Sequence, residues 1–409
     1  MTGASPAAGS ARSPRRIYVT DCEGPLTRND NAQEIAERFI PDGAAFFARL
    51  SKYDDFLVDV AQKPGYNAGN TLRLIPPFFR AFRVTDEDVE LFSSESLLVV
   101  PGALEALQAI VATMPAFVIS TSYTPYLRAL CALSGFPMDH VRCTELDLDD
   151  WSVPEEEARW LREWVPRICE RPLIEYPAEA MTAGGGHGAG FAGASHPAAA
   201  PAAQGTAAGA GTASAGAGGR AAPWRSPDAA LAWLSEQDRE TVRQLDRLFW
   251  QELPKRPVSK ALSDSVRPIG GGLKLAALEA IAAAEGARGE DVMYVGDSIT
   301  DTPPLAAVRT WGGVSLSFNG NAYALQAAEF AAAGTDAGAQ AELAKAFARS
   351  GRDAVVKAIR AWPTAAKGVT PTGKARTRVG LTGEEPEALA AASASARLGV
   401  RGERVARLG

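Results

Sequence analysis

Two acidic side chains, Asp21 and Glu23, directly follow the short apolar run Ile17-Tyr18-Val19 near the start of the chain. Residues two apart in an extended backbone point to the same side, so both carboxylates would face one space. Two carboxylates in one space repel each other unless a cation lies between them or one of them holds a proton. The pair therefore indicates either a solvated turn or part of a charged site, and its counter-charge must come from elsewhere in the chain.

Polar residues that could complete such a site follow two further apolar runs and three successive glycines. Ser120 follows the run from Ala116 to Ile119, and Asp297 and Asp301 follow the run from Val292 to Val295. Lys274 stands at the start of a predicted helix, directly after a Gly-Gly-Gly-Leu segment. These residues, together with Asp21 and Glu23, form one candidate set.

The chemistry that this set favours is phosphoryl transfer. A hard dication such as Mg2+ binds oxygen ligands, and Asp21 and Asp297 are the obvious pair to hold it beside a substrate phosphate. Lys274 supplies a positive charge for phosphate oxygens and Ser120 a hydroxyl donor. Asp21 would act as nucleophile and form a phosphorylated enzyme, and Glu23 would protonate the leaving oxygen and later activate water.

The elements that must position these residues alternate between strand and helix. Apolar runs predict strands, and amphipathic patterns predict helices over 103–112, 126–133, 227–253, 323–332 and 339–362, the last interrupted at Gly351. This alternation predicts a parallel sheet with helices on its faces, which is an α/β fold. Ligands in such sheets bind outside the carboxyl ends of the strands, where Asp21, Ser120 and Asp297 would all lie.

Helical patterns interrupt this alternation between the first two predicted strands. Within that insert lies a glycine-containing loop at 63–70, followed by a helix. Our candidate substrate contacts in this part of the chain are Tyr66, Asn67, Arg73 and Arg80. For any single arginine, exposure to solvent is a commoner situation than contact with a ligand. The predicted organisation is a disordered leader (1–14), the core (15–28, 99–150 and 266–332), a helical cap (29–98), helical inserts (151–181 and 226–265), a disordered Ala/Gly-rich linker (182–225), and a C-terminal helix with a mobile tail (333–409, mobile beyond Lys367).

The set resembles the four motifs of the haloacid dehalogenase (HAD) superfamily. Asp21 to Thr27 is similar to the first motif, Ser120 to the second, Lys274 to the third, and the run from Gly296 to Asp301 to the fourth. The resemblance implies a Rossmann-like core, dependence on Mg2+ and an aspartyl-phosphate at Asp21. It also implies metal ligation by Asp21, the Glu23 carbonyl and Asp297, with Asp301 supporting them, and a cap of the phosphoserine-phosphatase kind.

Some positions depart from the usual form of these motifs. Glu23 replaces the more common aspartate, as in the similar Asp-x-Glu-Gly sequence of enolase-phosphatases, and Pro25 is unusual. Together with the Phe-Asn-Gly-Asn segment at 318–321, the first motif most resembles an uncharacterised branch labelled energy-converting hydrogenase A subunit R. Thr121 or Ser122 replaces Ser120 in the second motif if the strand extends further than the apolar run.

Composition excludes several other classes of protein. The 409 residues include 42 Lys and Arg against 48 Asp and Glu, which argues against a nucleic-acid-binding protein. The four cysteines are scattered without a Cys-x-x-Cys pair, so neither a zinc site nor a disulfide framework is expected. We expect no membrane span and no secretory signal, and hence a cytoplasmic protein, because no long apolar run occurs.

The function predicted is a Mg2+-dependent phosphatase that hydrolyses a small phosphorylated metabolite. A catalytically silent binding or regulatory protein of the same fold is one alternative, and a phosphotransferase that uses the same aspartate is another. Substrate identity and oligomeric state do not follow from the sequence.

Overall fold

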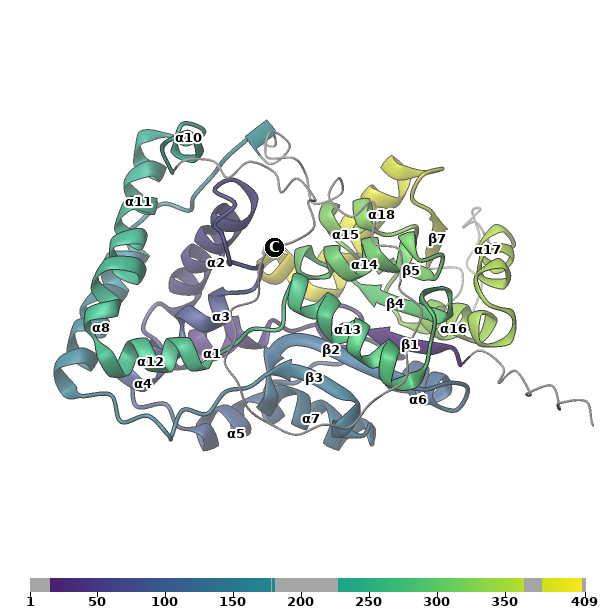
Figure 1. The fold of residues 1–409 in the computed structure, drawn as a ribbon, viewed down its shortest axis with the longest axis horizontal. Coiled ribbons are helices and arrows are strands. Elements are labelled where there is room, and N and C mark those ends of the chain that lie inside the picture. The colour runs from purple at the N-terminus through teal and green to yellow at the C-terminus, as the bar shows by residue number, and fades with distance from the viewer. Residues whose placement is uncertain (1–14, 178, 181–226, 364–376, 407–409) are drawn as a thin grey trace, which may run out of the picture.

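The computed structural model describes residues 15–177, 179–180, 227–363 and 377–406. A seven-stranded sheet lies on one side of the molecule and a layer of helices on the other (Figure 1). The predicted leader and the predicted Ala/Gly-rich linker lie outside the described residues.

The sheet has the order β3-β2-β1-β4-β5-β6-β7, and every neighbouring pair is parallel except β6 with β7. From β1 the chain adds β2 and β3 on one side and β4, β5 and β6 on the other side. Ligands bind at this switch point in open parallel sheets. The Rossmann-like α/β fold predicted from the sequence is thus confirmed. The strands are β1 (Ile17–Thr20), β2 (Ala116–Tyr123), β3 (Val141–Thr144), β4 (Val292–Gly296), β5 (Val314–Phe318), β6 (Phe330–Ala333) and β7 (Arg378–Leu381).

Both faces of the sheet are buried under helices, so all four residues of β1 are buried instead of alternating between buried and exposed. Tyr18 packs into the core on one face, while Ile17 and Val19 pack into the core on the other. The first face is covered by α6 (Ala103–Val111), α7 (Thr124–Ser134), α16 (Gly338–Ser350) and α17 (Arg352–Arg360); the second by α13 (Gly272–Glu285), α14 (Thr302–Thr310) and α15 (Ala322–Ala327). Short 3-10 turns are η1 (Met138–His140), η4 (Gly289–Asp291) and η5 (Ile299–Asp301).

The helical layer, called the helical cap below, has a single apolar core built from all three predicted helical segments. Tyr53, from the first segment, donates a hydrogen bond to Asp246 and accepts one of 2.7 Å from Trp250 Nε1, both in the third segment. The cap comprises α1 (Asn31–Phe39), α2 (Gly43–Asp59), α3 (Thr71–Leu74), α4 (Pro76–Ala81), α5 (Asp86–Ser96), α8 (Glu155–Cys169), α10 (Pro227–Leu231), α11 (Glu236–Asp246), the π-helix η2 (Arg247–Glu252), η3 (Leu253–Lys255) and α12 (Pro257–Ser265). The single helix expected over 227–253 is therefore wrong.

Two further expectations for the C-terminal third are wrong. The helix predicted over 323–332 ends at Ala327, and the Phe330–Ala333 segment is a strand, because burial between two strands outweighs the helix preference of alanine. The region beyond Lys367 is not simply a mobile tail, since it forms β7 and α18 (Pro386–Ala406). The break at Gly351 between two helices is confirmed.

Candidate functional site

Three carboxylates meet where β1 and β4 end. Asp21 follows β1 and Asp297 follows β4, and these strands are parallel neighbours, so their carboxyl ends lie side by side. Oxygens of Asp21, Asp297 and Asp301 all lie within 4.8 Å of one another, and all three residues are buried. Hard oxygen donors at this spacing fit a divalent cation such as Mg2+.

Gly24 allows the loop after β1 to pass directly over Asp297. Its φ of +100° lies in a region that favours glycine, and a Cβ atom built there would lie 2.3 Å from Asp297 Cγ. The glycine in the Asp-x-Glu-Gly sequence is therefore needed for the close approach of the two acidic loops.

Lys274 supplies the counter-charge predicted for this cluster. Its fully buried Nζ donates hydrogen bonds to Asp21 Oδ2 (2.6 Å) and to Asp301 Oδ1 (2.8 Å). Burial alone lowers the pKa of Lys274, but the two carboxylates raise it by more, so its net pKa lies above the ordinary value. The lysine at the start of α13 thus remains a cation.

The three carboxylates do not have equal freedom to bind a ligand. Asp301 accepts hydrogen bonds from Lys274 and from Tyr294 Oη (2.8 Å) at Oδ1, and from the backbone N–H groups of Asp297 and Ser298 at Oδ2. Although burial raises the pKa of Asp301, these contacts, led by Lys274, lower it overall. The pKa of Asp21 is raised, first by burial and then by the Asp301 carboxylate, and a bound cation would lower it.

Glu23 lines the same pocket and connects it to the first helix of the cap. Its Oε1 accepts a hydrogen bond of 2.8 Å from the backbone N–H of Asn31, at the start of α1. Burial, followed by the nearby Asp30 carboxylate, raises the pKa of Glu23 to about 8, and the Ser122 hydroxyl lowers it by less. A carboxyl group with this pKa holds a proton near neutral pH and can donate it.

The second predicted motif is displaced along its strand. β2 continues to Tyr123, and Ser120 is fully buried with its Oγ accepting a hydrogen bond of 3.2 Å from Ser122 N. Thr121 and Ser122 line the pocket, whereas Ser120 does not. The prediction of Ser120 as the hydroxyl donor is therefore corrected in favour of its two successors, because the strand extends four residues beyond the apolar run.

The predicted substrate contacts from the cap do not line the pocket. Arg73 pairs with Asp264, and Arg80 donates hydrogen bonds to Val84 O (2.7 Å), Asp149 Oδ1 (3.0 Å) and Trp151 O (3.1 Å), so both arginines hold cap segments together. Tyr66 packs edge-on against the Trp250 ring, and Asn67 lies beside Gly271 and Gly272. In place of these four residues, the nearby Gly69 and Thr71 line the pocket.

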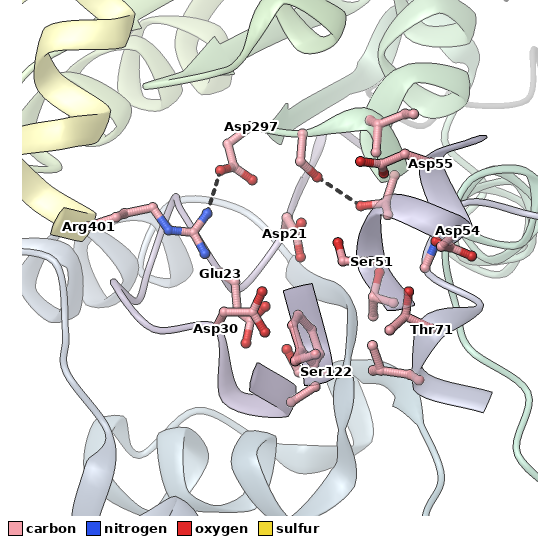
Figure 2. Close-up of a pocket in the computed structure, with 18 of the residues that line it drawn as sticks. Asp21, Glu23, Asp30, Ser51, Asp54, Asp55, Thr71, Ser122, Asp297 and Arg401 are labelled. Carbon is pink, nitrogen blue, oxygen red and sulfur yellow. Dashed lines mark hydrogen bonds and ion pairs between the residues drawn. The ribbon is translucent and has the colours of Figure 1, made fainter. Parts of the chain in front are cut away.

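The cap also contributes polar and acidic residues that were not predicted from the sequence. Ser51, Asp54 and Asp55 on α2 line the pocket opposite Asp21 (Figure 2). Asp54 Oδ2 accepts a hydrogen bond of 2.9 Å from Gly69 N, and burial raises the pKa of Asp54 to about 8. The sequence held a signal for it, since Asp54 falls four residues after Leu50 and seven after Phe47, on the apolar stripe of the helix.

Two arginines that were not predicted from the sequence reach the pocket from the C-terminal helix. Arg397 and Arg401 of α18 both donate to Asp297 Oδ2, at 2.9 Å for Arg401 Nη1. Figure 2 shows the contact of Arg401 with Asp297. Both side chains are only 6% exposed. They could not be found from local pattern, because only the tertiary fold brings α18 to the loop after β4.

The pocket enclosed by these residues is small, with a volume of about 120 Å3. Ligand pockets for drug-sized molecules commonly measure roughly 300–1,000 Å3. Most of the lining residues are polar or charged; the full set comprises Asp21, Glu23, Asp30, Ala32, Phe47, Ser51, Asp54, Asp55, Gly69, Thr71, Leu72, Thr121, Ser122, Asp297, Ser298, Ile299, Thr300, Arg397 and Arg401. With the cap in this position, the site suits a small, polar group.

Comparison with solved structures gives a similarity that extends over nearly the whole chain. No protein-family model matches the chain, and no curated protein matches its sequence. Among solved structures, the chain is similar to gene product AF1437 from Archaeoglobus fulgidus, with 26% sequence identity and a TM-score of 0.72. The match covers 97% of this chain and 99% of that chain, so it includes the sheet, the cap and the C-terminal region. None of the described helices combines the length and the apolar character needed to cross a membrane.

Proposed function

We propose that the chain is a Mg2+-dependent phosphomonoester hydrolase of the HAD superfamily that acts on a small phosphorylated metabolite. The observation that carries the proposal is the contact between Lys274 and Asp21 in a buried pocket that also holds Asp297, Asp301 and a proton-bearing Glu23. Positioning and charge neutralisation are what phosphoryl transfer mainly requires from a protein.

Asp21 is the nucleophile in this proposal. One of its carboxylate oxygens forms a bond to phosphorus while the bond from phosphorus to the leaving oxygen breaks. Lys274 holds Asp21 Oδ2 at 2.6 Å and fixes the direction of the carboxylate. Ser122 lies at the end of β2, where its hydroxyl group can donate to a phosphate oxygen, whereas the hydroxyl of the neighbouring Thr121 donates to the backbone carbonyl of Ile269 at 3.0 Å.

Glu23 is the proton carrier. In the first step it donates its proton to the leaving oxygen, and in the second it accepts a proton from the water that attacks phosphorus and releases Asp21. Its pKa of about 8 suits the first step near neutral pH. The hydrogen bond from Asn31 N couples its orientation to the position of the cap.

Asp21 and Asp297 would hold the dication, with the Glu23 carbonyl as the further ligand that the family resemblance implies and Asp301 supporting them through the loop. When bound, Mg2+ neutralises negative charge on the phosphate and orients it. The small pocket supports a small substrate, and four free cysteines support a reducing, cytoplasmic location.

A screen of phosphorylated metabolites with the purified protein and Mg2+ tests the proposal. We expect release of inorganic phosphate by the wild type and a loss of turnover in Asp21→Asn, which keeps the shape of the side chain but removes the nucleophile. Mass spectrometry of rapidly quenched samples should find the phosphoryl group on Asp21. Robust turnover by Asp21→Asn would exclude this nucleophile, and phosphate transfer to a second substrate without release would indicate a phosphotransferase.

One observation favours a second candidate, a catalytically silent protein of the same fold. Arg397 and Arg401 already neutralise Asp297, the residue that would bind the metal. A silent protein would show no turnover across the panel even where Mg2+ binding is measurable by calorimetry.

A further inference from the structure

The C-terminal helix α18 brings two positive charges into the site from the far end of the sheet. In Figure 1 the yellow chain runs from β7 across the core to the space beside α2. Arg397 and Arg401 are four residues apart and therefore lie on one face of the helix. Gly402, with φ 79° and ψ 167°, interrupts the helix directly after Arg401.

Both arginines are fixed by contacts beyond Asp297 Oδ2. Arg397 Nη1 also contacts the Asp297 backbone carbonyl at 3.4 Å. Arg401 donates to the backbone carbonyls of Arg28 (3.3 Å) and Asn29 (2.8 Å), in the segment that connects the first motif to the cap. The guanidinium groups are thus held at the pocket by the protein itself, and both residues line it.

The ion pairs of the site balance in charge. Three carboxylates, Asp21, Asp297 and Asp301, contact three cations, Lys274, Arg397 and Arg401. A dication added alone leaves this group with an excess of two positive charges, and a phosphate dianion added with it restores the balance. Without the arginines, the dication alone would balance the group, and the dianion would then leave an excess of two negative charges.

The charge balance with and without the arginines shows that they oppose binding of the dication and favour binding of the dianion. Buried charges a few ångströms apart interact strongly because screening by solvent is weak. The electrostatic field of Arg401 also reaches Glu23 and Asp30, which take no part in these ion pairs. The charge balance above is that of the three paired carboxylates and their three cations.

Resting on the proposed function, we propose that Arg397 and Arg401 are positioning residues that weaken binding of Mg2+ alone and strengthen binding of a phosphate dianion together with Mg2+. They act through Asp297 and through the charge of the pocket. The site then takes up the metal and a dianionic phosphomonoester as a pair, and a free dication gains little by entering it.

The test compares the wild type with Arg397→Gln/Arg401→Gln by calorimetry. Mg2+ is titrated first in the absence of phosphate, and inorganic phosphate is titrated next at saturating Mg2+. We expect the double variant to bind Mg2+ about tenfold more tightly and phosphate about tenfold more weakly, each corresponding to the removal of nearby charge. A merely structural role of α18 would weaken both ligands, so weakening of both, or no change in either, overturns the proposal.

Two further variants control for charge and for folding. Arg397→Lys/Arg401→Lys keeps the charges, so its affinities for Mg2+ alone and for phosphate with Mg2+ should stay close to those of the wild type. Arg128→Gln/Arg360→Gln removes two arginines that are 60% and 67% exposed, and it should leave both affinities unchanged. Turnover is measured on the same samples. If the wild type hydrolyses phosphomonoesters and the Gln variant keeps both affinities, the role of the arginines is overturned while the proposed function stands. If the wild type binds neither Mg2+ nor phosphate, both proposals are overturned.

A measurement on the wild type keeps the test decisive if the Gln variant does not fold. Binding effects are reciprocal, so a ligand that the arginines oppose must also loosen the arginines. Hydrogen exchange of the α18 amides should become faster with Mg2+ alone and slower again with Mg2+ and phosphate. Equal or slower exchange with Mg2+ alone contradicts the proposal.

Discussion

Lys274 Nζ lies 2.6 Å from Asp21 Oδ2 and is fully buried there, so the cation and the proposed nucleophile are held together without solvent between them. The same Nζ contacts Asp301 Oδ1 at 2.8 Å. One lysine therefore compensates two carboxylates that come from different strands.

Replacing Lys274 by Met should destabilise the protein strongly. The change leaves the buried Asp21 and Asp301 carboxylates without their cation, and breaking a buried ion pair in this way costs about 3–5 kcal/mol. Denaturant unfolding at neutral pH measures the loss. Lys260→Met is the matched control, since its pair with Asp264 is partly exposed and should contribute at most about 1 kcal/mol. Similar effects of the two variants would contradict the structural importance of Lys274.

Two serines of β2 should respond differently to removal of their hydroxyl groups. Ser122 lines the pocket, and we expect Ser122→Ala to lower kcat/KM roughly 10- to 100-fold through the loss of a donor to phosphate. Ser120 lies outside the pocket, so Ser120→Ala should keep most of the activity. Steady-state kinetics with the best substrate of the screen compares them. A larger loss of kcat/KM in Ser120→Ala than in Ser122→Ala would support the role predicted for Ser120 from the sequence.

How far the sequence predicted the site depended on the range of the contacts involved. Asp21, Asp297 and Lys274 were recognisable because each stands at the end of an apolar run or at a helix start, and the carboxyl ends of parallel strands meet. Ser120 was chosen over Ser122 because hydrophobicity does not reveal that a strand continues through polar residues. Arg73 and Arg80 are charged residues with partners inside the cap, and local sequence cannot distinguish such partners from a ligand.

The fold was predictable where local sequence decides the secondary structure. The prediction failed where tertiary contacts override the local preference for helix or strand. The alternation of strands and helices fixed the parallel core, but the alanine-rich β6 has the local composition of a helix. The contacts of Arg397 with Asp297 join residues 100 positions apart, and no periodicity records them. The prediction of a mobile tail failed because this segment makes long-range contacts, which include the buried side chains of Leu389 and Val400 as well as the pairing of Arg397 with Asp297.

Gly24→Ala should weaken metal binding. The added Cβ would lie 2.3 Å from Asp297 Cγ in a backbone conformation with φ +100°, so the loop or the carboxylate must move. Calorimetry with Mg2+ should show a loss of at least about tenfold in affinity, since a ligand displaced by 1 Å breaks the coordination geometry. Gly135→Ala is the control, because Gly135 also has a positive φ of +71° but no atoms near its Cβ position. Unchanged affinity in Gly24→Ala would contradict the predicted metal position.

Asp54 should make the protein less stable as the pH rises, because it is buried in the cap side of the pocket. Its pKa is raised by burial from 3.8 to about 8, so between these values the folded protein holds a proton that the unfolded chain has released. The contribution of Asp54 to the free energy of unfolding is fully present below about pH 4 and is lost as the pH rises through about 8. Asp54→Asn removes this dependence, and its stability relative to the wild type should improve by a few kcal/mol between pH 5 and pH 9. Denaturant unfolding at pH 5, 7 and 9 measures the difference, with Glu87→Gln, an exposed acid of α5, as the control. Parallel pH profiles for Asp54→Asn and the wild type would show that the pKa of Asp54 is the same in the folded protein and in the unfolded chain, which would contradict the prediction.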